Sequence, residues 1–256
     1  MNYYLILGLV LLVYMTSWFG ISVLKKRNDV ADIAWGLGFV LLTWVSFVIS
    51  GAFSVSSFVI GILVTIWGVR LAVHIHARNK GKTEDYRYLA WRKEWGKWFY
   101  LRSYIQVYLL QGLLLYLIIF PVVLFNAHPS TTIFGFLGYA GVLIWGIGFF
   151  FESVGDAQLG VFMRDPRNKG ALMKSGLWRY TRHPNYFGEV TQWWGIWLIT
   201  LNSMYGWYGI IGPIVITTLI LKVSGIPMLE KKMEQNPEFA EYKRRTSVFI
   251  PLPPKS

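Results

Sequence analysis

Cysteine is absent from this chain of 256 residues, so disulfides and thiolate metal sites are excluded. Common nucleotide motifs are missing as well: no Gly-x-Gly-x-x-Gly follows an expected strand, and there is no P-loop. His74 and His76 are two positions apart and do not share a helix face, so we expect no metal site. No Ser–His–acid set can be nominated by spacing.

Long apolar runs dominate what is present, because 54% of the residues are hydrophobic. A helix that crosses a bilayer needs about 20 mostly apolar residues. The first run lacks a basic leading segment and a small-residue cleavage site, so we expect a retained helix and not a signal peptide. The sequence therefore predicts an all-α polytopic transmembrane bundle of about seven helices in a single membrane domain, residues 1–256. The expected spans are residues 3–24, 31–50, 53–74, 104–125, 132–152, 186–201 and 205–223.

Charge is strongly segregated along the chain, which has 25 Lys and Arg against 13 Asp and Glu. With seven spans, every cation falls on one side, and the connections 51–52, 126–131 and 202–204 carry none. The positive-inside rule makes that side cytoplasmic, with the N-terminus outside and the C-terminus inside. A basic rim beside anionic lipid accounts for the net charge of +12. We therefore expect an integral protein of a bacterial inner membrane that binds no nucleic acid.

Two segments on the basic side have distinctive compositions. Residues 80–102 mix charge with aromatic side chains, which is typical of a helix lying along the lipid headgroups. The tail contains an expected helix over residues 227–244, followed by a proline-rich end.

Four acids lie in or beside the apolar spans, where ionised groups are costly and often functional. Glu152 and Asp156 are four residues apart and share a helix face. They would either anchor arginines from the loops or bind hydroxyl and amide groups of a ligand. Asp32 lies one turn into the second span and is either a partner for an arginine such as Arg70 or a functional group. Glu189, the fourth acid, belongs to the densest polar run of the chain.

That run, residues 175–189, places cations before a helix start. Pro184 suits the first turn of a helix, where its missing N–H is not needed. Free amides and the positive end of the helix dipole would face Arg179, Arg182 and His183. Together these groups predict an anion site for a phosphate or pyrophosphate.

Asn185 and Glu189 follow on the same helix, four residues apart. A basic cap at the membrane edge would explain the cations alone. It does not explain Glu189, which lies about one turn into the membrane. We therefore favour a ligand site.

The run GLWRYTRHPNYFGE, residues 176–189, resembles the signature of the steroid 5-alpha-reductase-like membrane family. More narrowly, the chain is similar to the branch known as DUF1295. Residues 32–39, 84–88, 152–158 and 242–251 resemble further segments of that branch, so the resemblance spans nearly the whole chain.

The resemblance implies a helix bundle whose cytoplasmic half encloses NADPH and reduces a carbon–carbon double bond in a lipidic, sterol- or enone-like substrate. Asp156 matches a cofactor-binding acid of the reductases. Asn185 and Glu189 match the Asn-x-x-Gly-Glu pattern that holds the nicotinamide end. The cofactor half is expected within residues 156–256. The expected cofactor-binding residues are Glu152, Asp156, Arg164, Lys174, Arg179, Tyr180, Arg182, His183, Asn185, Tyr186 and Glu189.

The substrate end departs from the steroid enzymes. They carry an asparagine where Glu152 falls, and their glutamine–glutamate pair is not recognisable in the second span, so steroid specificity is not carried over. The candidates for polarising the substrate are Asp32, Tyr108 and Gln111. Small residues at 34, 36 and 38 would either leave room for an apolar substrate coming sideways from the bilayer or allow close helix packing.

Two other functions fit parts of the pattern. The Arg-His-Pro motif is shared with isoprenylcysteine carboxyl methyltransferases and phospholipid methyltransferases, which bind S-adenosylmethionine. Those families lack the Gly-Glu ending present at Gly188 and Glu189, which favours the reductase. A non-enzymatic scaffold or transporter is the third possibility. A transporter would place polar groups near the bilayer midplane, whereas the charges here stop in the inner half of the spans.

Overall fold

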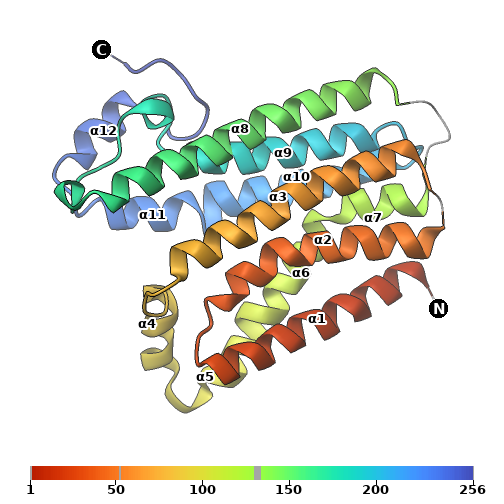
Figure 1. The fold of residues 1–256 in the computed structure, drawn as a ribbon, viewed down its shortest axis with the longest axis horizontal. Helices are drawn as coiled ribbons and strands as arrows, with labels where there is room; N and C mark the ends of the chain where they lie inside the picture. The colour runs from red at the N-terminus through yellow and green to blue at the C-terminus, as the bar shows by residue number, and fades with distance from the viewer. Residues whose placement is uncertain (1, 52, 130–133, 256) are drawn as a thin grey trace. The chain divides into compact units, whose positions relative to one another are not determined.

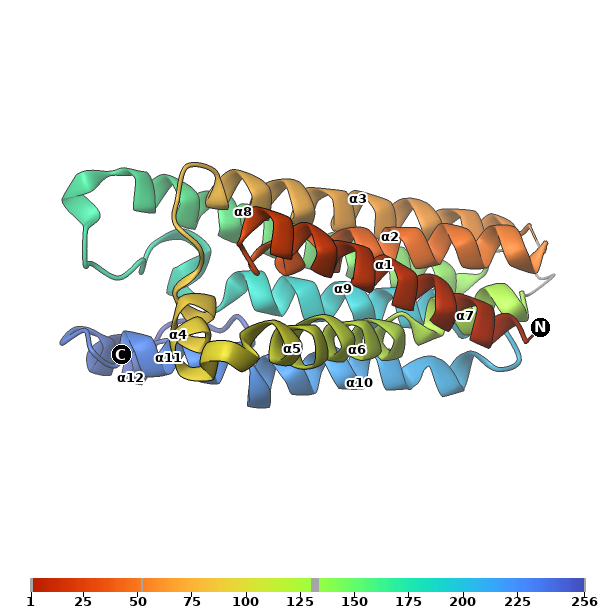
Figure 2. The same ribbon diagram turned by 90° about the horizontal axis from the view of Figure 1, so that it is seen from below.

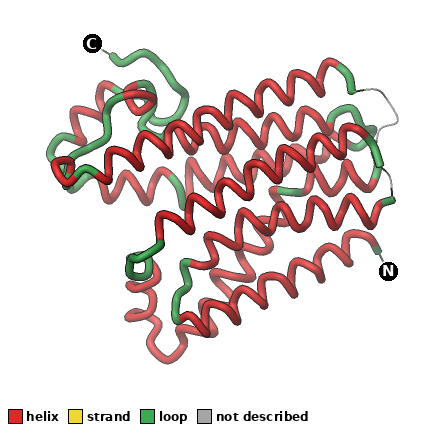
Figure 3. The backbone as a smooth tube through the Cα atoms, in the orientation of Figure 1, coloured by secondary structure: helices red, strands yellow, loops and turns green. Residues whose placement is uncertain are grey.

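The computed structural model describes residues 2–51, 53–129 and 134–255. All regular elements within these residues are helices, as the red segments of Figure 3 show, and the all-α class is confirmed. Within the described residues, six helices are long and apolar enough to cross a membrane, which makes the chain a polytopic membrane protein. They are Tyr3–Lys25, Val30–Ser50, Val55–Asn79, Tyr86–Ile118, Phe136–Arg164 and Gly206–Met233.

The sixth predicted span is also helical. It corresponds to α9 (Pro184–Thr200), which has 17 residues and is shorter than the six helices above. The predicted start of the fifth span, at residue 132, lies outside the described residues.

The chain divides into two compact units. Unit 1 comprises Met1–Gly135 and Thr200–Gly212, and unit 2 comprises Phe136–Ile199 and Pro213–Ser256. The single membrane domain stays a prediction.

Unit 1 is built on α1 (Tyr3–Lys25), α2 (Val30–Ser50) and α3 (Val55–Asn79), with α2 packed against both neighbours (Figure 1). Gly36 and Gly68 meet where α2 and α3 touch. A Cβ atom at Gly36 would lie 2.6 Å from the Gly68 carbonyl oxygen. A Cβ atom at Gly38 would meet Leu115 at the same distance. Both glycines therefore serve close packing, and the space expected beside them for a substrate is filled.

A chain of short helices forms the rest of unit 1. It consists of α4 (Tyr86–Trp95), η1 (Gly96–Trp98), α5 (Phe99–Ser103), the π-helix η2 (Tyr104–Leu109) and α6 (Leu110–Ile118). Figure 2 shows α5 and α6 as one rod beside α1. The predicted span 104–125 is wrong as a continuous helix, because it breaks at Ile119. Pro121 lies in the first turn of the next helix, α7 (Phe120–Ala127), and cannot donate the hydrogen bond that would continue α6. The helix η5 (Gly206–Ile210) completes the unit.

Unit 2 contains α8 (Phe136–Arg164), the short helices η3 (Pro166–Asn168) and η4 (Gly176–Arg179), and α9. It continues through α10 (Ile211–Thr218), which begins in unit 1, the π-helix η6 (Leu219–Val223), α11 (Ile226–Met233) and α12 (Phe239–Arg245). The helix predicted over residues 227–244 is therefore two helices. Pro237 disfavours helical geometry in the residue before it, and the chain turns between Met233 and Phe239.

Candidate functional site

A glycine contact brings α8 and α9 together at the proposed site. A Cβ atom at Gly188 would overlap the Glu152 backbone and the Gly148 carbonyl oxygen, so only glycine fits there. One turn nearer the start of α9, Pro184 contacts Gly155 of α8. The polar side chains of both helices consequently lie against each other.

Two side-chain hydrogen bonds link the helices across this contact. Asn185 Nδ2 donates to Asp156 Oδ1 at 3.1 Å, and Gln192 Nε2 donates to Glu152 Oε2 at 2.5 Å. Three residues expected at the site, Asn185, Asp156 and Glu152, are thus brought together. Gln192 was not predicted as a site residue. The spacing could have indicated it, because Gln192 lies three residues after Glu189 on the same face of α9.

Two polar side-chain atoms of α8 and α9 are buried without a hydrogen-bond partner among the described residues. They are Oε1 of Gln192 and Oγ of Ser153. Leaving such an atom unsatisfied costs about 1–3 kcal/mol, so each calls for a ligand or water. Glu189 is half-buried between Asn185 and Gln192 along α9.

Arg182 is placed differently from the prediction. Its side chain is buried, and Nε donates to Glu230 Oε1 at 2.7 Å. Nη1 donates to the carbonyl oxygens of Thr246 and Lys243, at 2.5 and 3.1 Å. A buried guanidinium needs such partners to offset its lost hydration. Arg182 thus binds the C-terminal segment, by which we mean residues 242–249. This geometry does not support the phosphate-binding role expected for Arg182.

His183 is bound by the same carboxylate. Its Nε2 lies 3.2 Å from Glu230 Oε1, the residue is 1% exposed, and its ring stacks on Tyr186. Among the described residues, Nδ1 has no hydrogen-bond partner. Glu230 was not predicted, because an acid in a charged tail has the pattern of a solvated surface residue.

The other expected cofactor residues lie around the loop before α9. Arg164, Arg179 and Tyr180 are exposed, and Lys174 forms an ion pair of 2.7 Å with Glu238. The side chains of Arg164 and Arg179 are therefore open to solvent.

The C-terminal segment is hydrogen-bonded into that loop. Thr181 pairs with Ser247 as a β-bridge, and its Oγ1 donates to the Phe249 carbonyl oxygen at 2.8 Å. Tyr242 donates its hydroxyl to the Trp178 carbonyl oxygen at 2.5 Å. Burial raises the pKa of Tyr242 above its ordinary value, so this hydroxyl keeps its proton.

A second polar cluster lies in unit 1 around Asp32. Tyr88, which is 2% exposed, donates its hydroxyl to Asp32 Oδ1 at 3.1 Å, and Arg87 Nη2 donates to Oδ2 at 3.2 Å. Asp85 caps α4 by accepting from the Arg87 amide. Burial alone would raise the pKa of Asp85, but the Arg87 hydrogen bonds outweigh it and lower that pKa. Tyr88 and Arg87 are partners that sequence spacing did not single out.

Tyr108 and Gln111, the other two substrate candidates, lie in and just after the π-helix η2. Tyr108 is fully buried, and its hydroxyl lies 3.5 Å from the Asn28 carbonyl oxygen. Oε1 of Gln111 is buried with no hydrogen-bond partner among the described residues. Single π-turns of this kind are frequent at functional sites.

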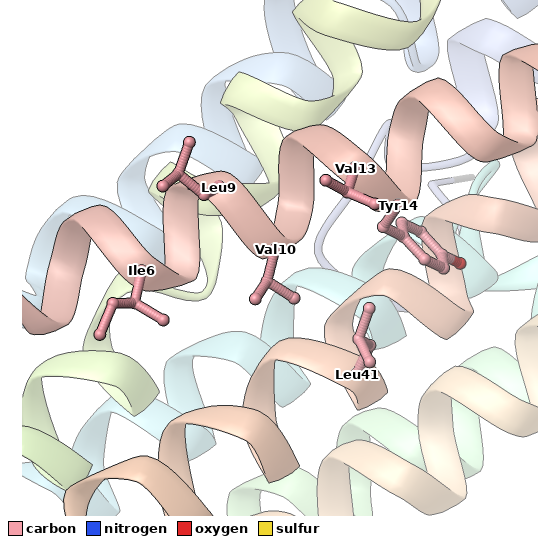
Figure 4. Close-up of a pocket in the computed structure, with 6 residues that line it drawn as sticks. All are labelled: Ile6, Leu9, Val10, Val13, Tyr14 and Leu41. Carbon is pink, nitrogen blue, oxygen red and sulfur yellow. The ribbon is translucent and has the colours of Figure 1, made fainter.

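An open apolar groove of about 480 Å³ runs along α1 beside Leu41 of α2 in unit 1 (Figure 4). The Tyr14 hydroxyl donates to the Ala34 carbonyl oxygen, so the groove offers hydrocarbon and not hydrogen bonds. None of the predicted polar residues lines it. The lining residues are Ile6, Leu9, Val10, Val13, Tyr14 and Leu41.

The helices and the polar cluster at the start of α9 define a polytopic membrane protein with polar groups gathered at one end of its spans. Residues 18–246 match the family described as "Protein of unknown function (DUF1295)". The chain therefore belongs to the DUF1295 family.

A curated relative is also similar over most of the chain. An uncharacterized protein of Schizosaccharomyces pombe is 26% identical over 270 residues, covering 91% of this chain and 75% of its own length. No solved structure matches.

Proposed function

We propose that the protein is an NADPH-dependent reductase of a carbon–carbon double bond in a lipidic substrate. The observation that carries the proposal is the α8–α9 contact. It places Asn185, Gln192 and two carboxylates together along the first half of α9, after a loop with exposed arginines.

The chemistry of these groups fits NADPH. A nicotinamide carboxamide both donates and accepts hydrogen bonds, which suits Asn185, Glu189 and the unpartnered Oε1 of Gln192. The phosphates need cations, which Arg164 and Arg179 would supply. When bound, NADPH supplies the hydride, and the task of these residues is to orient the cofactor and exclude water.

Reduction of an enone also needs a group that polarises the carbonyl. The candidates for that group stay those predicted from the sequence, namely Asp32, Tyr108 and Gln111. The Tyr88 hydroxyl donates its one hydrogen to Asp32 Oδ1, so it has none left for a carbonyl.

The orientation is part of the proposal. Placing all 25 cations on the cytoplasmic side gives the loop before α9 direct access to a polar cofactor. An apolar substrate would instead come from the bilayer.

Thermal stability of the purified protein in detergent tests the proposal. A ligand at 100 times its Kd stabilises the folded state by about 2.7 kcal/mol, so saturating NADPH should raise the melting temperature by several degrees. S-adenosylmethionine is the matched comparison. Stabilisation by that compound with none by NADPH would refute the reductase, and measured methyl transfer to a lipid or prenyl acceptor would then establish the methyltransferase alternative. Oxidation of NADPH by an enone lipid then tests turnover.

A further inference from the structure

The carboxylate of Glu230 joins two consecutive residues of the loop before α9. Its Oε1 accepts from Arg182 Nε at 2.7 Å and lies 3.2 Å from His183 Nε2. Lys243 Nζ lies 3.8 Å from the other oxygen, Oε2. One side chain from α11 therefore holds the side chains of two residues that come just before α9, the helix that carries Asn185 and Glu189.

The same contact determines which nitrogen of His183 carries hydrogen. A carboxylate beside a guanidinium is ionised and can only accept. Nε2 must therefore be the donor, as the partner of one ring nitrogen sets the state of the other. In the neutral ring, Nδ1 is then a bare acceptor.

That acceptor is buried and unsatisfied. His183 is 1% exposed, and no described residue gives Nδ1 a hydrogen-bond partner. A bare acceptor is repelled by a phosphate oxygen, whereas it binds a hydroxyl or amino group. The chemistry of Nδ1 is therefore opposite to the anion-binding role expected from the sequence.

We propose that Glu230 is a positioning residue that holds His183 with Nδ1 as an acceptor, and that Nδ1 accepts from a sugar hydroxyl or an amino group of the bound nucleotide. The ligand half of this inference rests on the proposed function. The phosphates are left to the exposed arginines. Through Glu230, α11 becomes part of the cofactor site.

Nitrogen-15 NMR of the protein labelled at histidine tests the inference. The chain has four histidines, and the signal of His183 is identified by its loss in His183→Gln. Without nucleotide, we expect hydrogen on Nε2 and a bare Nδ1. Adding NADPH should move the Nδ1 resonance towards that of a hydrogen-bonded acceptor.

Glu230→Gln is the informative variant, because an amide either donates or accepts and no longer enforces one tautomer. We expect a mixture of tautomers and a rise of at least tenfold in the Kd for NADPH. Glu234→Gln is the matched control, since Glu234 is exposed, follows α11 directly and pairs with Lys243. It should change neither quantity. A merely structural role for Glu230 would lower the melting temperature of Glu230→Gln without altering the tautomer.

Hydrogen on Nδ1 in the wild-type protein would overturn the inference, as would an Nδ1 signal that stays in place when NADPH binds. Failure of the proposed function has a different signature. The wild-type protein would then bind no NADPH, which also removes the ligand half of the inference, while the tautomer is still read without nucleotide.

Discussion

At the scale of single residues, Glu189 is where membrane insertion and ligand binding make opposite demands. A carboxylate near the centre of a membrane helix costs about 2.5–3.5 kcal/mol on insertion scales. Glu189 lies only one turn inside α9, between Asn185 and Gln192, and is half-buried. Under the proposed function, its carboxylate would bind the cofactor.

We predict that Glu189→Gln raises the Kd for NADPH by about tenfold, or about 1.4 kcal/mol, without reducing expression. Neutralising the side chain removes the insertion cost but also the charged acceptor. Glu241→Gln on α12 serves as the control, because its side chain is 53% exposed and paired with Arg244. An unchanged Kd together with a raised melting temperature would mean that Glu189 is a liability and not a ligand.

The sequence predicted that Glu152 and Asp156 share one helix face and that Asn185 and Glu189 share another, because the members of each pair are four residues apart. It did not predict the contact between Asp156 and Asn185, which depends on how α8 packs against α9. The partners of Arg182 come from Glu230 and from carbonyl oxygens of the tail. Such contacts depend on tertiary packing and leave no spacing pattern.

At the scale of helices, glycine contacts decide how closely the spans approach. Gly36 faces a backbone carbonyl of α3, whereas Gly20 on α1 has nothing within 4 Å of its missing Cβ. The two glycines lie in neighbouring helices and offer a matched pair.

We predict that Gly36→Ala destabilises the protein by about 1–3 kcal/mol, the usual cost of overpacking. The α2–α3 backbones would have to move apart. Gly20→Ala should be neutral or slightly stabilising, because alanine favours helix. Melting temperatures of both variants in one detergent check this. Equal behaviour of the pair would contradict the close α2–α3 contact.

Helix positions were predictable where apolar runs are long and uninterrupted, as in α1, α2 and α3. The sequence failed to predict two helix breaks, one at Ile119 and one between α11 and α12. Both breaks lie close to a proline. Composition still favoured a helix there, but the missing N–H of Pro121 and the geometry before Pro237 outweighed it.

At the scale of the whole molecule, the distribution of charge predicts the orientation in the membrane. Since the chain has no cysteine, single cysteines report accessibility without background. Met204 is 85% exposed in a connection free of cations. Lys97 is exposed in η1 on the basic side.

We predict that a membrane-impermeant maleimide labels Met204→Cys in intact cells. Lys97→Cys should react only after the membrane is opened. The reverse pattern would place the loop before α9 outside and would remove its access to cytoplasmic NADPH.

The hydrogen bonds between the C-terminal segment and the loop before α9 also determine when the site can form during synthesis of the chain. The hydroxyl of Thr181 bonds to a carbonyl 68 residues further along the chain. At about 5–20 residues per second, a ribosome needs about 3–14 s to make that stretch. During this interval the loop has been synthesised but lacks the C-terminal residues that are hydrogen-bonded to it. The site is therefore the last part of the molecule to be completed, and a chain that stops early would carry most of its spans without it.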